Sequence, residues 1–334
     1  MANPNCITLA DYMHMEVPTL VKGCVQQMRE DSPLLNKLQF HTENRLKFFN
    51  YLGPSAVEGG TWKSIGEQYD EGHQFDYKRI EETTYYIGRE FKIDERLEGV
   101  ADACIEDPVK AEVAARTKAI QRQVCNGIIN GSSKDNNGKS FVGIKERMNK
   151  LPATQTIQAN TTTDALDLRT SAANYAQNVE EFIVLMNKLC KAVDGGRPDF
   201  FIVNEDFQIK FESILRTSGL LSYSKDNMER EFASFKGIPF IDIGRKEDDE
   251  TYIINNNETI TGGNGTVGTD FCTSIYAVKQ DTSHFTMLEK SPFRVRDNFN
   301  DPHMISHIYV MDWALGMMIT HPRSVARLQG LRLY

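Results

Sequence analysis

The chain has 334 residues, of which 40% are hydrophobic and 25% charged, and its formal net charge at pH 7 is −8. A length of this order predicts about two domains with a large core. The acidic balance argues against a protein that grips nucleic acid through phosphate contacts, because such proteins usually carry a basic stripe.

The amino terminus has neither a basic start nor an apolar run of signal-peptide length, so we expect no secretion signal. The most apolar stretch, residues 305–322, is interrupted by His307 and Asp312 and is too short to cross a bilayer comfortably. These features favour a soluble chain with no membrane contact.

The first regular spacing lies near the amino terminus. Thr8 and Asp11 fit a capping box, and Val21, Cys24 and Met28 follow at helical intervals. We expect a short helical arm whose own apolar surface is too small to form a core.

Residues 44–98 are rich in aromatic and β-branched side chains. Thr83, Tyr85, Ile87 and Phe91 share one parity, which is typical of a strand with one covered face. A turn-like stretch interrupts the run near its middle, so we predict a long hairpin-like arm. At about 3.3 Å per residue it would reach on the order of 50 Å, beyond an ordinary single core.

The clearest helix follows this arm. Asp107 is a candidate N-cap and Pro108 fits the first helical position. The apolar stripe of this helix consists of Val113, Thr117, Ile120, Val124 and Ile128. A helix from Pro108 to Asn130 would be about 35 Å long at 1.5 Å per residue.

The rest of the chain alternates helix-like and strand-like segments, which predicts an α+β or α/β organisation without internal repeats. We expect helices at 179–193 and 205–216, and strands at 199–204, 238–243, 251–261, 269–280 and 306–319.

Gly263, Gly265 and Gly268 have the G-x-G-x-x-G spacing of dinucleotide-binding proteins. That motif binds a pyrophosphate only when a helix N-terminus follows it. Residues 269–280 are strand-like instead, so we predict a loop between two strands. A dinucleotide-dependent enzyme that uses these three glycines remains the alternative from another functional class.

No residue pattern predicts a catalytic, cofactor-binding or metal-binding site. His303 and His307 would align on a helix, but their segment is β-like and places them about 13 Å apart, too far to share one zinc ion. The acidic run 245–250 is expected to be a solvated turn, since it lacks the spacing of a calcium loop.

The six cysteines never form a C-x-x-C pair and are expected to be reduced packing residues. They are Cys6, Cys24, Cys104, Cys125, Cys190 and Cys272.

The order of segments, a short amphipathic arm, a long β arm, a long helix and a mixed α/β body, resembles the major capsid proteins of tailed phages, which have the Hong Kong 97-like fold. The resemblance covers nearly the whole chain, and its specificity lies in the order and spacing of short stretches. These stretches are residues 89–99, 130–148, 199–219, 235–243, 274–280 and 321–334.

The resemblance implies an α+β capsid fold with four parts. They are an N-terminal arm (1–44), an extended E-loop hairpin (45–97), a peripheral domain with a long spine helix (98–158 and 290–320) and an axial domain (159–289 and 321–334). Within the E-loop it implies contacts with other subunits through Trp62, Ile65, Tyr69, Phe75, Tyr77 and Ile80.

The function that this resemblance implies is structural and not enzymatic. The chain would assemble with copies of itself into hexamers and pentamers of an icosahedral phage head, a virion capsid built in the bacterial cytoplasm. The head would enclose double-stranded DNA without sequence-specific binding and without a cofactor. An encapsulin-like nanocompartment shell is the alternative within the fold.

The partners implied are a scaffolding protein, a portal and a decoration protein. The E-loop begins by about Arg45, which leaves no room for a fused scaffolding segment ahead of the arm, so a separately encoded scaffold is expected.

Overall fold

The structure is a computed structural model, and it describes residues 6–12, 19–42, 47–52, 59–69, 78–94, 108–159, 165–172, 174–218, 222–225, 228–258, 272–300 and 306–333. Its α-helices are α1 (Leu9–Tyr12), α2 (Thr19–Asp31), α3 (Pro33–Lys37), α5 (Pro108–Asn130), α6 (Ile144–Met148), α7 (Tyr175–Ala192) and α8 (Glu205–Ser218). Its short 3-10 turns are η2 (Asp135–Gly138), η3 (Ala153–Gln155) and η4 (Asp194–Gly196).

The strands form three sheets. The five-stranded sheet has the order β1 (Cys6–Thr8), β2 (Gln39–Thr42), β13 (Phe285–Asn300), β14 (Ser306–Ile319) and β5 (Tyr85–Asp94). The eight-stranded sheet runs β6 (Thr156–Gln158), β15 (Val325–Arg332), β12 (Thr273–Val278), β8 (Phe200–Val203), β11 (Ile238–Asp242), β10 (Glu231–Phe235) and β9 (Ser222–Lys225), with β7 (Leu166–Asp167) beside β15. The third sheet is the hairpin of β3 (Lys47–Leu52) and β4 (Lys78–Thr83).

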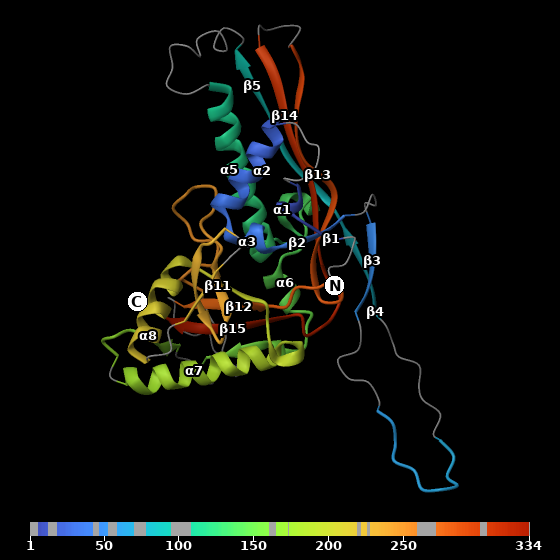
Figure 1. Cartoon of the computed structure of the whole chain (residues 1–334), viewed down its shortest axis with the longest axis vertical. Helices are drawn as coiled ribbons and strands as arrows, with labels where there is room; N and C mark the ends of the chain where they lie inside the picture. Colours follow the sequence, from blue (N-terminus) through green and yellow to red (C-terminus); the bar gives the residue numbers. More distant parts are fainter. Residues whose placement is uncertain are drawn as a thin grey trace.

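Two hydrophobic cores lie on opposite faces of the eight-stranded sheet. Strand β8 shows the alternation: Phe200 and Ile202 belong to one core, while Phe201 and Val203 belong to the other. Every residue of β12 is likewise buried. Helices α7 and α8 cover one face, and the core of the other face continues into the five-stranded sheet and helix α5 (Figure 1).

Helix α5 has the predicted bounds and the predicted buried stripe. Val113, Thr117, Ile120, Val124 and Ile128 are each at most 5% exposed. Its carboxyl end packs closely against the chain that follows, because a Cβ on Gly131 would lie 2.5 Å from the Phe141 backbone carbonyl oxygen. The stripe therefore faces the core that the sequence pattern implied.

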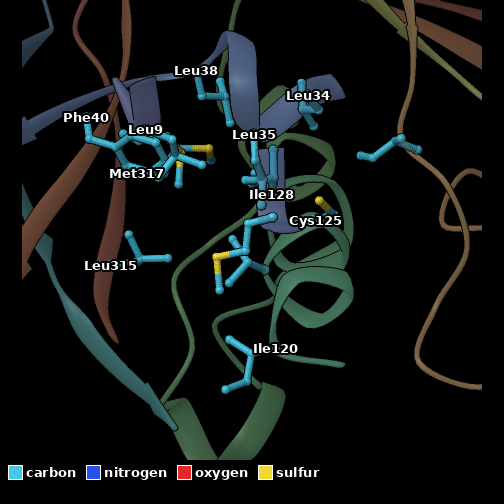
Figure 2. Packing of buried hydrophobic residues seen from close by; sticks show 14 of the residues in the cluster. Leu9, Leu34, Leu35, Leu38, Phe40, Ile120, Cys125, Ile128, Leu315 and Met317 are labelled. Atoms are coloured by element: carbon cyan, nitrogen blue, oxygen red, sulfur yellow. The ribbon is translucent and has the colours of Figure 1, made fainter. Parts of the chain in front are cut away.

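The amino-terminal segment packs on helix α5 of its own chain. The capping box is present, since Asp11 Oδ2 accepts a 2.8 Å hydrogen bond from the Thr8 backbone N–H. Helix α2 buries Val21, Cys24 and Met28 in the core that includes α5. In Figure 2, Leu35 and Ile128 point toward one another. Strand β2 then pairs in parallel with β13, so this segment belongs to the body of the subunit.

Two long strands, β13 and β14, form an antiparallel pair that extends along helix α5 (Figure 1). The predicted strand 306–319 is confirmed, whereas His303 lies outside the described residues. Strand β5 pairs antiparallel with β14 from Ser306↔Asp94 to Leu315↔Tyr85. At Gly88 the two strands approach so closely that a Cβ would lie 2.2 Å from the Met311 carbonyl oxygen.

The strand predicted at 251–261 is wrong over its described part, 251–258, where only isolated bridges occur. Side-chain amides take the backbone carbonyls that a neighbouring strand would need. Asn130 Nδ2 donates to the Ile253 carbonyl at 2.8 Å, and Asn204 Nδ2 donates to the Ile254 carbonyl at 3.1 Å. The acidic run before it is a turn with exposed side chains from Glu247 to Glu250, as predicted.

The predicted burial of cysteines is confirmed for Cys24, Cys125, Cys190 and Cys272, which are free and buried. No helix in the described part of the chain is long and apolar enough to cross a membrane.

Candidate functional site: the arm and its anchor

The six E-loop residues singled out in the sequence fall into three groups. Trp62 and Ile65 are fully exposed and Tyr69 is 87% exposed. Ile80 is half-buried in β4. Phe75 and Tyr77 lie outside the described residues. The described loop 59–69 lies well away from both cores, beyond the β3–β4 hairpin (Figure 1).

The hairpin predicted for this region is present at its base. Strands β3 and β4 pair antiparallel from Lys47↔Thr83 to Leu52↔Lys78. The exposed Lys47 ammonium forms a 2.5 Å ion pair with Glu81, and this contact raises the lysine pKa through the hydrogen bond and the nearby negative charge. The loop is therefore held by a regular two-stranded stem.

Arg147 of α6 anchors that stem to the body. Its guanidinium forms a bidentate pair with the Glu82 carboxylate of β4, and one of the two contacts is 2.7 Å. The same guanidinium donates to the carbonyls of Met317 and Val142, each at 2.9 Å. Both charged side chains are largely buried, so the contact fixes where the arm leaves the subunit.

A hollow of about 150 Å³ lies beside this anchor. Apolar side chains of Ile80, Val142 and Ile319 line it together with Lys150 and the Arg147–Glu82 pair. This places the half-buried Ile80 at the root of the arm, whereas Trp62, Ile65 and Tyr69 are at its outer part.

A second buried charge network connects α6 to the eight-stranded sheet. Glu258 accepts from Arg327 at 2.8 Å and from Lys145 at 2.7 Å, and Ser274 donates to it as well. Burial raises the pKa of Glu258, but Arg327, Lys145 and the Ser274 hydrogen bond more than offset it, so the pKa lies below its ordinary value. The carboxylate is thus held in its charged form.

Sequence reasoning missed a cluster formed by Asp194, His284 and His321. Ligand atoms of the three side chains lie within 4.8 Å of one another. The segments that carry them are far apart in the sequence, and no local spacing signals that they meet.

Gly263, Gly265 and Gly268 lie outside the described residues. The segment after them, from Thr273 to Val278, is strand β12, as predicted. A strand does not present the free N–H groups that a dinucleotide pyrophosphate requires. The geometry after the glycines therefore does not support the enzyme alternative.

Comparison with family models found no match, and no curated protein matched the sequence. Solved structures did match over nearly the whole chain. The encapsulin SrpI of Synechococcus elongatus PCC 7942 is 11% identical, with a TM-score of 0.61, and the alignment covers 98% of this chain and 96% of that one.

Two further structures agree with this arrangement. A protein of mycobacterium phage Bobi is 13% identical, with a TM-score of 0.54 and coverage of 89% of each chain. The capsid protein of a native GTA particle is also 13% identical, with a TM-score of 0.52, covering 87% of this chain and 86% of that one. This chain has the Hong Kong 97-like capsid fold.

The α+β assignment and the resemblance to this fold are therefore confirmed. The Hong Kong 97-like fold occurs here in an encapsulin and in phage-type capsids alike, so the fold does not separate the two kinds of shell. At these identities the likeness extends to the fold alone.

Proposed function

We propose that this protein is a shell subunit that assembles with copies of itself and has no catalytic role. The observation that carries the proposal is the exposure of Trp62, Ile65 and Tyr69 on a loop that lies outside both cores of its own subunit. Large apolar side chains in such a position are typical of a surface that another chain covers.

The energy available from this contact is substantial. Fully burying one large apolar side chain contributes about 1.5–3 kcal/mol, so the three together would contribute roughly 4.5–9 kcal/mol before the cost of ordering the loop. A closed shell repeats this contact at every subunit.

A two-stranded stem is marginally stable in water, which makes the buried Arg147–Glu82 anchor important for presenting the loop.

We propose the four-part division of the fold with one change to its limits. The limits of the N-terminal segment (1–44), the peripheral domain (98–158 and 290–320) and the axial domain (159–289 and 321–334) are unchanged, although residues 19–42 pack on the body of their own subunit. Because β5 pairs with β14, residues 85–94 are better grouped with the peripheral domain, and the projecting E-loop then runs from about 47 to 83.

For the kind of shell, we propose the icosahedral head of a phage, built from hexamers and pentamers around double-stranded DNA, with a scaffolding protein, a portal and a decoration protein as partners. The net charge of −8 supports a shell that contains DNA without gripping it. The second candidate is an encapsulin-like compartment, supported by the 98% coverage of this chain in the encapsulin alignment.

The test of assembly is a triple variant, Trp62→Ser, Ile65→Ser and Tyr69→Ser, compared with Trp62→Phe, Ile65→Val and Tyr69→Phe. We expect the serine variant to fold with unchanged circular dichroism but to form no closed shells in negative-stain electron microscopy. The conservative variant should form shells. Normal shells from the serine variant would refute the role of the loop.

The kind of shell is tested by the contents of particles purified from the native source. A phage head contains double-stranded DNA that resists nuclease until the shell is opened. Particles that instead contain a stoichiometric cargo protein and no protected DNA would support the encapsulin-like alternative.

A further inference from the structure

Three side chains from separate segments meet where the two large sheets join. Asp194 lies in η4 after α7, His284 lies in the turn between β12 and β13, and His321 lies in the turn between β14 and β15. His284 Nε2 is 3.1 Å from Asp194 Oδ2, and the two imidazole rings are 5.3 Å apart between centroids. Both turns carry the chain from one sheet to the other.

Backbone hydrogen bonds hold these segments in place without the side chains. The Thr320 N–H donates to the His284 carbonyl at 2.8 Å, which joins the two turns. The Asp194 N–H donates to the Arg323 carbonyl at 2.9 Å, which joins η4 to the second turn. The cluster is therefore pre-organised, as a ligand site on rigid elements requires.

The orientation of His284 also suits coordination. Its Nδ1 faces Ser283 Oγ at 2.9 Å and Asp281 Oδ2 at 3.7 Å, on the side away from Asp194. An outer carboxylate or hydroxyl that accepts the Nδ1 proton leaves the Nε2 lone pair available toward the cluster, which is the usual arrangement of metal-binding histidines.

We propose that Asp194, His284 and His321 bind a divalent transition-metal ion of the zinc type. Two imidazole nitrogens and one carboxylate oxygen are a common ligand set for such ions, with water in the fourth position. A bound ion would join both turns and η4.

Two contacts of the metal-free cluster oppose binding. The Lys279 ammonium is 3.4 Å from Asp194 Oδ2 and donates to the Asp194 carbonyl at 3.1 Å. The Arg323 N–H donates to His321 Nδ1 at 3.2 Å, and coordination through either ring nitrogen releases this bond. The lysine competes for the carboxylate, so its removal should increase metal affinity.

The test is titration of the full chain with CoCl2 and ZnCl2, followed by visible absorption for cobalt and by calorimetry for zinc, with MgCl2 as the comparison ion. We expect one zinc or cobalt ion per chain and no saturable magnesium binding. His284→Ala and His321→Ala should each weaken cobalt binding by about tenfold or more. Lys279→Met should strengthen it severalfold.

His307→Ala is the matched control, because His307 lies in β14 away from the cluster. It should bind cobalt as the wild type does. Absence of saturable binding in the wild type, equal binding in His284→Ala, or an equal loss in His307→Ala would overturn the proposal. If either histidine variant fails to fold by circular dichroism, Lys279→Met decides: unchanged or weaker affinity in that variant contradicts the proposed site.

Discussion

Arg147→Met should destabilise the subunit more than a typical single substitution. The change removes the guanidinium that pairs with Glu82 and donates to the carbonyls of Met317 and Val142. The Glu82 carboxylate would then remain at the root of the arm, largely buried and without this cation.

The size of the effect follows from the burial. The Arg147 side chain is 13% exposed and the Glu82 side chain 9%, so solvent screens their interaction little. Removing one partner of such a pair costs about 3–5 kcal/mol, whereas replacing both partners by apolar residues is often close to neutral. A loss of about 4 kcal/mol would change the folding equilibrium constant about a thousandfold.

The assay is urea unfolding of unassembled subunits, followed by tryptophan fluorescence. The chain has two tryptophans, and Trp62→Phe leaves Trp313, which is fully buried in the core that includes α6 and β14. In that background we expect Arg147→Met to lower the free energy of unfolding by about 3–5 kcal/mol, and the double change with Glu82→Met to recover much of it.

The control is Lys225→Met, which removes an exposed cross-strand pair with Glu231 at 3.4 Å. It should lower the free energy of unfolding by at most about 1 kcal/mol. If Arg147→Met costs no more than this control, or if the effects of Arg147→Met and Glu82→Met simply add, the anchor contributes less than the argument requires.

Two further predictions concern the sheets. Gly88→Ala should lower the free energy of unfolding by at least about 1–3 kcal/mol. The new Cβ would lie 2.2 Å from the Met311 carbonyl oxygen, so the two strands would have to move apart. Gly23→Ala, where the Cβ meets nothing within 4 Å, should be neutral or stabilising in the same urea assay, and similar losses in both would contradict this reasoning. The folded-state pKa of Glu258 lies below its ordinary value of 4.5. The charged carboxylate therefore stabilises the fold above pH 4.5, and this stabilisation is lost as the pH falls through the folded-state pKa. The stability difference between wild type and Glu258→Gln should therefore shrink below about pH 4.5, and a constant difference from pH 7 to pH 3.5 would exclude this role.

The parts of the fold that the sequence predicts are those with strong local patterns. The apolar stripe of α5 predicts which face of the helix is buried, and the β-like residues of 306–319 predict a strand, independently of what packs against them. The strand predicted at 251–261 failed because Asn130 and Asn204 hydrogen-bond to its backbone from elsewhere in the chain. Periodicity contains no information about such distant partners.

The candidate site likewise contains residues that the sequence indicated and residues that only the fold brings together. Trp62, Ile65 and Tyr69 stood out as apolar residues among charges, and the structure places them in the exposed loop. The Arg147–Glu82 anchor and the Asp194–His284–His321 cluster join residues from separate elements. Their approach depends on how β13 and β14 connect the two sheets, so only the folded arrangement brings them together.

The most direct test of the central claim is electron cryomicroscopy of the purified full chain, expressed with and without its native neighbouring genes. We expect closed icosahedral shells in which the loop bearing Trp62 lies against an adjacent subunit. A chain that remains a monodisperse monomer at high concentration in both preparations would contradict it.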